Sequence, residues 1–425
     1  MSQFSVYLDR QQKLSVTDYF PATENRNTFF VTIPCYDEPE LLKTLNSLAE
    51  CKPPSAGVSV VVVVNSSDKS PLEVLESNLE TISSVVNWMK VQPPFYQLRL
   101  LHAQSLPSKW AGVGWARKIA MDEAIRCLNQ SDQDDGIIAA FDADSLVSPN
   151  YFTKIEETFR RNPRYNFVNL NFCHPVDDPS LEVGMQEGII LYELYLRYLR
   201  NAMQWCGYPH AIHTVGSSFA VRASAYVKQG GMNRRQAGED FHFLHKIVLL
   251  GDYGHISDAT VYPAARVSHR VPFGTGAALQ KWREGNIELK SAYSLKIFET
   301  LKPLFADPCY FFKTESTEWE NWICLFDKRL QDYIRQTGTL DRLIELKKNC
   351  ADIRNFVNRF YHQVNAFWII QYLNLSESNE GGKGILAEEA AQLLTKMNIE
   401  TSGELTVREL LEIFRKIDNE MPKSD

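Results

Sequence analysis

The chain has 425 residues, of which 44% are hydrophobic and 23% are charged, as in an ordinary globular protein. This length is large for one hydrophobic core, so we expect one larger domain with an appended part. The net charge of -7 argues against a nucleic-acid-binding surface. Eight scattered cysteines without C-x-x-C spacing indicate reduced thiols and a cytoplasmic protein. No apolar run has the length of a transmembrane segment.

Short apolar runs alternate with amphipathic segments in the first 150 residues. Near-continuous valine in residues 58–64 suits a strand that is covered on both faces, as in a parallel sheet. The alternation predicts an α/β fold with a mostly parallel sheet flanked by helices. We expect strands at 29–33, 58–64, 98–101 and 136–141, with helices at 40–51, 72–89 and 112–129.

The second half of the sequence is mainly helical. Apolar spacing predicts helices at 182–205, 241–250, 341–348 and 352–373, and polar, glycine-containing residues 374–384 read as a linker or loop. We therefore expect a lead-in over residues 1–27, an α/β domain over 28–280 and a helical C-terminal region over 281–425.

Polar residues follow three of the predicted strands, at 34–38, 65–68 and 142–144. Ligands of parallel α/β sheets bind beyond the carboxyl ends of the strands. The sequence therefore predicts a binding site where these three turns meet.

Two carboxylates separated by one residue, Asp142 and Asp144, end the strand at 136–141. Carboxylate oxygens are suitable ligands for Mg²⁺ or Mn²⁺, which commonly leave positions for substrate phosphates. The alternative is a solvated turn, because aspartate is frequent after strands. The position after a buried strand favours the metal site.

Five sequence blocks, in order, resemble the family 2 glycosyltransferases, which have the GT-A fold. The resemblance covers about residues 29–275 and implies a nucleotide-sugar transferase. The blocks are VTIPCYDEPELL (31–42), VVVVNSSDKS (61–70), GVGWARKIAMDEA (112–124), AAFDADSLVSPNYF (139–152) and VGSSFAVRASAYVKQGGMNRRQAGEDFHF (215–243).

The resemblance implies which residues contact the nucleotide. Pro34, Tyr36 and Glu38 would lie against it, and Asn65 would read the base. The family usually has an aspartate where this chain has Asn65. An amide offers a donor as well as an acceptor, so the identity of the base stays open.

Cationic residues are the expected partners of the donor diphosphate. The resemblance makes Lys109 and Arg117 candidates, although a solvated helix start is the alternative for both. Arg266 and Arg270 would also neutralise the diphosphate, because a guanidinium binds phosphate oxygens in pairs. His269 is a candidate metal ligand or a structural histidine.

The pair Glu239-Asp240 matches the E-D end of the fifth block. The resemblance makes Asp240 the general base that takes the proton of the acceptor hydroxyl, and a helix cap is the alternative. Within the D-x-D block, we expect Asp144 to ligate Mn²⁺ or Mg²⁺ directly. Asp142 would face the donor ribose or a metal-bound water.

A segment outside the family resemblance follows the spacing of an EF-hand loop. Residues 398–409 carry oxygen side chains at loop positions one, three and five, glycine at six and Glu409 at twelve. Predicted helices at 387–397 and 407–417 would form a helix-loop-helix. Asn398 and Glu400 replace the usual aspartates, so any binding of Ca²⁺ would be weak.

The expected activity is metal-dependent transfer of a sugar from a nucleotide-diphosphate sugar to an acceptor hydroxyl, with inversion. The acceptor could be a saccharide, a lipid-linked sugar or a small molecule, and a peripheral location at the inner face of the membrane stays open. The alternatives are a retaining transferase of the same fold and a non-catalytic nucleotide-sugar or calcium-responsive binding module.

Overall fold

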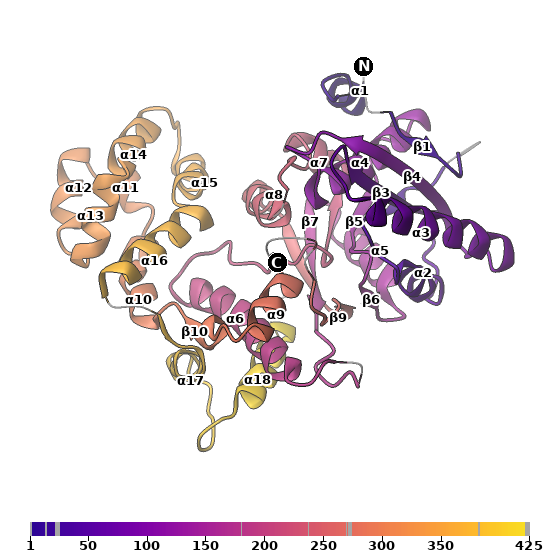
Figure 1. Cartoon of the computed structure of the whole chain (residues 1–425). Helices are drawn as coiled ribbons and strands as arrows, with labels where there is room; N and C mark the ends of the chain where they lie inside the picture. Colours follow the sequence, from indigo (N-terminus) through magenta and orange to yellow (C-terminus); the bar gives the residue numbers. More distant parts are fainter. Residues whose placement is uncertain are drawn as a thin grey trace. The chain divides into compact units, whose positions relative to one another are not determined.

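The computed structural model describes residues 2–12, 15–21, 26–179, 181–236, 238–268, 270, 274–380 and 383–420 (Figure 1). The chain divides into two compact units. Unit 1 comprises Met1–Ile189, Thr214–Glu284 and Lys416–Asp425, and unit 2 comprises Ile190–His213 and Gly285–Arg415.

A nine-stranded sheet forms the centre of unit 1, in the order β1-β4-β3-β2-β5-β8-β7-β9-β6. Strands β4, β3, β2 and β5 are parallel neighbours, whereas β8 is antiparallel to both β5 and β7. The sheet is therefore mixed, with a parallel half built by the first 140 residues. The strands are β1 (Thr17–Asp18), β2 (Phe29–Cys35), β3 (Val58–Ser67), β4 (Gln97–Leu106), β5 (Ile137–Ala140), β6 (Leu146–Val147), β7 (Phe167–Phe172), β8 (Phe219–Arg222) and β9 (Tyr253–Tyr262).

Helices cover both faces of this sheet (Figure 1). The helices of unit 1 are α1 (Gln3–Asp9), α2 (Leu41–Ala49), α3 (Leu72–Val91), α4 (Val113–Gln130), α5 (Tyr151–Arg161), α7 (Ala223–Lys228), α8 (Glu239–Ile247) and α9 (Thr275–Arg283). A 3-10 turn, Val248–Leu250, extends α8, and α6 (Met185–Trp205) and α18 (Val407–Asn419) include residues of both units.

Every residue of β2 is buried, because the strand is covered on both faces. Alternate residues, such as Val31 and Ile33, share a core cluster with Leu45 of α2 and Phe152 of α5. Helix α4 packs against the other side of β2 and β3, and it also contacts α1 and α8. Since α4 is enclosed on several sides, even most of its charged residues are buried, Arg117 among them.

Unit 2 is helical and has an aromatic core, in which Phe311 stacks on Phe360 and Tyr333 packs on Trp368. A short two-stranded antiparallel sheet pairs β10 (Ser291–Ala292) with β11 (Gly384–Ile385). The helices of unit 2 are α10 (Leu295–Ala306), α11 (Tyr310–Lys313), α12 (Ser316–Ile323), α13 (Lys328–Gln336), α14 (Thr339–Lys348), α15 (Ile353–Gln363), α16 (Ala366–Glu380) and α17 (Leu386–Lys396). Glu288–Lys290 forms a 3-10 turn.

The predicted strands and helices of the first 150 residues are confirmed, with small changes of boundary. The expected lead-in contains α1 instead, in which Phe4 and Tyr7 are buried. The Tyr7 hydroxyl donates to Asp122 at 2.7 Å and accepts from Lys118 at 2.8 Å. The prediction of an irregular lead-in was wrong for α1, because the residues that bond Tyr7 lie more than a hundred positions away in the sequence.

Two further predictions about the C-terminal region were wrong in detail. The expected helix 352–373 is divided at residues 364–365, where the Asn365 side chain accepts from the Trp368 amide and starts α16. The expected linker at 374–384 is helical up to Glu380. Polarity suggested a loop there, but glycine enters the sequence only at residue 381.

The predicted helix-loop-helix is confirmed, with α17 and α18 on either side of the loop. Glu409 accepts hydrogen bonds from the amide and the hydroxyl of Thr406, at 2.9 and 2.8 Å. The Thr406 hydroxyl in turn accepts from the Glu409 amide at 3.3 Å. This capping box occupies the carboxylate that was expected to ligate Ca²⁺.

Among the described residues, none of the helices combines the length and the apolar character that crossing a bilayer requires.

Candidate active site

The carboxyl ends of β3, β2 and β5 lie side by side, because β2 pairs with both of its parallel neighbours. This arrangement brings Asn65 at the end of β3, Glu38 after β2, and Asp142 and Asp144 after β5 to one edge of the sheet. The predicted convergence of the three polar turns is therefore confirmed. Ligands of parallel sheets bind at such an edge.

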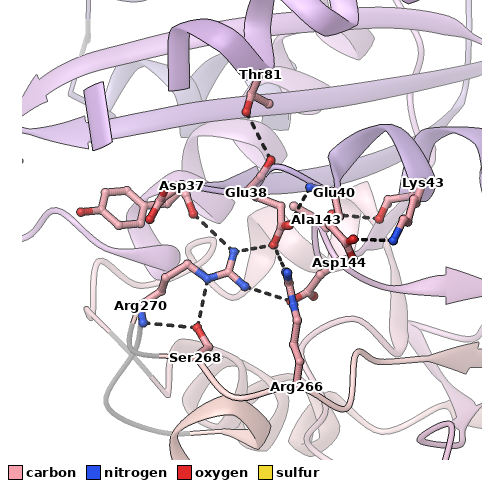
Figure 2. Close-up of polar contacts among 12 residues, drawn as sticks. Asp37, Glu38, Glu40, Lys43, Thr81, Ala143, Asp144, Arg266, Ser268 and Arg270 are labelled. Atoms are coloured by element: carbon pink, nitrogen blue, oxygen red, sulfur yellow. Dashed lines mark hydrogen bonds and ion pairs between the residues drawn. The ribbon is translucent and has the colours of Figure 1, made fainter. Parts of the chain in front are cut away.

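Two arginines that follow β9 contact two carboxylates at this edge (Figure 2). Glu38 Oε2 accepts from both Arg266 and Arg270. Asp144 Oδ2 accepts from the same two residues, at 3.2 and 3.1 Å. We call these four residues the arginine–carboxylate cluster. The Ser268 hydroxyl accepts from Arg270 Nε at 3.0 Å and fixes that side chain.

Glu38 lies at the buried end of this cluster and is 0% exposed. Its Oε1 accepts from the Glu40 amide at 2.9 Å, and its backbone oxygen accepts from Thr81 at 3.3 Å. Glu38 was predicted to lie against the nucleotide, but its carboxylate faces Arg266 and Arg270. A buried carboxylate with two guanidinium partners is a fixed anchor for those arginines.

Asp144 lies at the accessible end of the cluster, with 24% of its side chain exposed. Burial and the neighbouring Asp142 raise the pKa of Asp144, and Arg270 and Arg266 lower it without cancelling that rise. The negative charge of Asp144 is therefore only partly compensated by its arginine partners. A cation near Asp144 would stabilise its ionised form.

Arg117 of α4 is a buried connection between two parts of the site, with 2% of its side chain exposed. Its guanidinium donates to Asp142 at 2.7 Å and to Glu239 at 3.0 Å. It also donates to the backbone oxygens of Gly216 and Phe141, at 3.1 and 3.4 Å. Arg117 was predicted to bind the diphosphate, but four protein oxygens already accept from its guanidinium.

Asp240 lies in the first turn of α8, beside Arg117. An ideal Cβ placed on Gly216 would be 2.9 Å from Asp240 Oδ2 and 3.0 Å from Arg117 Nη2, so a larger residue there would require these side chains to shift. Burial and the charge of Glu239 raise the pKa of Asp240 to about 7, and Arg117 opposes the rise. The alternative of an N-cap was wrong, because Gly238 holds that position.

Asn65 is 2% exposed, and its Oδ1 is a buried acceptor that has no hydrogen-bond partner among the described residues. Asn78 of α3 lies beside it and donates to the Asn65 backbone oxygen at 3.0 Å. Asn78 also accepts a hydrogen bond from the amide of Asp37, at 3.0 Å. Asp37 has a left-handed backbone conformation, with a φ of 49°. Asn78 thus ties the turn after β2 to the end of β3 and leaves the Asn65 acceptor available.

The other four predicted site residues are Pro34, Tyr36, Lys109 and His269. Pro34 is buried within β2, and Tyr36 follows that strand with its backbone oxygen 3.4 Å from Arg270 Nη1. Lys109 is exposed, and its ammonium lies 5.6 Å from the ring centre of Trp110. His269 lies outside the described residues.

The donor set for a divalent cation consists of the carboxylates of Asp142 and Asp144. Each has one oxygen bonded by an arginine, so the second oxygen of each can be offered to a metal. Within the described part of the chain, no group of three or more His, Cys, Asp and Glu side chains could form a complete cage. Two carboxylates fit Mg²⁺ or Mn²⁺, which take further ligands from substrate phosphates and water.

Sequence reasoning missed three residues of this site: Asn78, Ser268 and the ion-pairing role of Glu239. Asn78 carried a usable signal, because it begins the buried stripe Asn78, Thr81, Ile82 and Val85 of α3. A polar residue on an apolar stripe indicates a specific buried hydrogen bond. Glu239 gave no comparable signal, because its partner Arg117 is far away in the sequence, whereas Ser268 bonds the nearby Arg270.

Two family models match the sequence. The model described as glycosyltransferase like family 2 matches residues 26–186, and that described as glycosyl transferase family group 2 matches residues 137–284. Together they cover the whole sheet from β2 to β9 and all of the site residues. The chain belongs to the family 2 glycosyltransferases and is a glycosyltransferase enzyme of the GT-A fold.

Comparisons with other proteins gave weaker likenesses. TarS residues 1–349 of S. aureus, solved in complex with UDP-GlcNAc, is 15% identical, with a TM-score of 0.42 over 80% of this chain and 92% of that chain. The mannosyltransferase PcManGT of Pyrobaculum calidifontis, solved with GDP-Man and Mn²⁺, is 14% identical, with a TM-score of 0.37 over 99% and 94%. A search of curated proteins found no match.

Proposed function

We propose that this enzyme transfers a sugar, with inversion, from a nucleotide-diphosphate sugar to an acceptor hydroxyl and depends on Mn²⁺ or Mg²⁺. One observation carries the proposal. The buried Arg117 bonds Asp142 of the D-x-D turn on one side and Glu239, the neighbour of Asp240, on the other. A single guanidinium therefore bonds one carboxylate of the expected donor site and the residue next to the expected base.

The donor would be bound at the edge formed by β3, β2 and β5. The unpartnered acceptor of Asn65 is suited to a donor group on the edge of the base. Arg266 and Arg270 supply guanidinium donors for the diphosphate oxygens. Asp144, with Asp142, would hold the metal, which supplies positive charge to the diphosphate leaving group.

Asp240 would act as the general base. A carboxylate whose pKa is about 7 is better matched to proton transfer near neutral pH than an ordinary aspartate. It would take the proton of the acceptor hydroxyl while that oxygen attacks the anomeric carbon from the face opposite the diphosphate. Arg117 is a positioning residue in this scheme, because it acts through Asp142 and Glu239.

The acceptor would be a hydroxyl of a saccharide, a lipid-linked sugar or a small molecule. For the location, we propose the cytoplasm, with peripheral contact with the inner face of the membrane left open. Eight free cysteines support a reducing compartment.

Thermal-shift screening of nucleotide sugars, with and without Mn²⁺, tests the donor site. We expect one nucleotide to raise the melting temperature only when Mn²⁺ is present, and we expect Asp144→Ala to abolish that rise. A rise that persists in Asp144→Ala would reject Asp144 as the metal residue. NMR analysis of the product anomer then separates inversion from retention, in which Asp240 would orient a substrate instead.

A further inference from the structure

The residues of the arginine–carboxylate cluster pair with one another in the absence of a ligand. Two guanidiniums and two carboxylates make four ion pairs, all between Arg266 or Arg270 and Glu38 or Asp144. The oxygen that Asp144 gives to the arginines is the same atom, Oδ2, in both pairs. The expected metal residue and the expected diphosphate residues are therefore bound to each other.

We infer that Asp144 exchanges partners during donor binding: Arg266 and Arg270 hold it in the free enzyme, and they pass to the diphosphate when the metal takes Asp144. Nucleotide and metal would then bind with strong positive cooperativity. This inference rests on the proposed function, because it requires a diphosphate and a divalent cation at this site.

The positions of the two carboxylates explain why the arginines would move together and remain in the site. Glu38 is 0% exposed, whereas Asp144 has 24% of its side chain exposed. A ligand from solvent can therefore compete for Asp144 but not for Glu38. Glu38 would keep hold of both guanidiniums after Asp144 had been given up.

The free cluster also contains an unsatisfied group. Arg266 Nε is buried and has no acceptor among the residues that the structure describes. A buried donor without a partner is costly, and a phosphate oxygen would satisfy it. A bound phosphate could therefore give Arg266 Nε a hydrogen bond that the described residues do not provide in the free protein.

Charge balance gives the reason for cooperativity. A metal that binds alone at the second oxygen of Asp144 adds positive charge beside two guanidiniums and competes with them for this carboxylate. A diphosphate that binds alone draws the guanidiniums away and leaves the Asp144 carboxylate without its partners. When both ligands bind, every charge has a partner again, so each ligand favours the other.

Arg270→Met tests the two proposed roles of Arg270, which are to pair with Asp144 in the free enzyme and to bind the diphosphate. In the absence of nucleotide, we expect this variant to bind Mn²⁺ at least about fivefold more tightly than the wild type, because Asp144 has lost a competing cation. With UDP or GDP present, the variant should bind Mn²⁺ no more tightly than the wild type, because the diphosphate has lost the Arg270 guanidinium as a partner. Electron paramagnetic resonance of free Mn²⁺ measures both affinities without any turnover.

Three further variants complete this experiment. Arg161→Met removes an arginine that pairs with Glu157 on the exposed surface of α5, and its Mn²⁺ affinity should equal that of the wild type. Adding Asp144→Asn to Arg270→Met should abolish the gain. Arg266→Met is the second test if Arg270→Met fails to fold, as thermal unfolding would show.

The outcomes are distinct. Tighter Mn²⁺ binding by Arg270→Met alone, with loss of the gain in the double variant, supports the exchange. If the wild type binds Mn²⁺ cooperatively with UDP or GDP while Arg270→Met shows no gain, the exchange is rejected and the proposed function stands. If the wild type binds no Mn²⁺ with either nucleotide, the metal-dependent function and the exchange are both rejected.

Discussion

Asp240 determines the pH dependence that we expect. Burial and Glu239 raise its pKa to about 7. A general base works only when it is deprotonated, so the rate should rise with pH up to the pKa and level off above it. Below pH 7, kcat should fall by about tenfold for each pH unit. A profile of kcat between about pH 5.5 and 9 checks the direction, and a rate that rises on acidification would contradict the assignment.

Asp240→Asn keeps the size of the side chain and removes its basicity. We expect kcat to fall by about 10²- to 10⁴-fold, the range for positioned proton transfer, with little change in nucleotide affinity. Asp258→Asn is the matched control, because Asp258 is an exposed residue of β9 paired with Lys154. Steady-state kinetics of both variants measures the effect. If Asp240→Asn kept the kcat of the wild type, the general base would be another residue.

Asn65→Leu replaces a buried acceptor without a partner by an apolar group of similar size. Since Oδ1 has no hydrogen-bond partner among the described residues, the free energy of unfolding should change little or increase. Nucleotide affinity should fall by about tenfold, because the base loses its partner. Calorimetric titration with UDP and GDP, together with urea unfolding, measures both. A large loss of stability with unchanged affinity would assign Asn65 a structural role.

The sequence could identify site residues within single turns but not their partners. Asp142 and Asp144 were predictable because they follow an apolar strand directly. The pairing of Asp144 with Arg266 and Arg270 was not, because the strands and loops between them span more than a hundred residues. For the same reason, the sequence did not show that Glu38 and Arg117 form buried ion pairs with other protein groups.

Helix α3 supports the nucleotide-binding edge through Asn78, which bonds the turn after β2 and the end of β3. Asn78→Ala should lower the free energy of unfolding by about 2 kcal/mol, because two buried hydrogen bonds are lost. It should also weaken nucleotide binding, since both turns are released. Urea unfolding and nucleotide titration measure these changes.

Asn46→Ala of α2 is the control for Asn78→Ala. Asn46 accepts from Trp88 Nε1 at 2.9 Å, away from the strand ends. We expect this variant to lose stability without any loss of nucleotide affinity. Equal losses of affinity in both variants would mean that Asn78 acts only through general stability.

Elements with strong periodicity were predictable, and elements defined by distant contacts were not. The valine run of β3 and the apolar run of β2 predicted buried parallel strands, which the structure confirms. Helix α1 was missed because its side chains become buried only through distant contacts with α4 and α7. Helix α16 was predicted to end early because composition alone does not show that Ser376 and Glu377 are buried.

At the scale of the whole enzyme, the proposed metal dependence leads to a prediction about metal removal. Asp142 and Asp144 provide two carboxylates, so the cation would be held weakly without the diphosphate. Removal of metal by EDTA should abolish turnover, and added Mn²⁺ or Mg²⁺ should restore it. The melting temperature without nucleotide should hardly change, because the fold of unit 1 rests on its apolar core. Full activity in EDTA would refute the metal requirement.

The most direct test of the account is the release of nucleoside diphosphate from a panel of nucleotide sugars, measured with Mn²⁺ for the wild type and Asp144→Asn. We predict that the wild type consumes at least one donor, faster when an acceptor hydroxyl is supplied, and that Asp144→Asn loses this activity while remaining folded. Wild-type rates retained in Asp144→Asn would contradict the central claim that the carboxylates after β5 bind the donor and its metal.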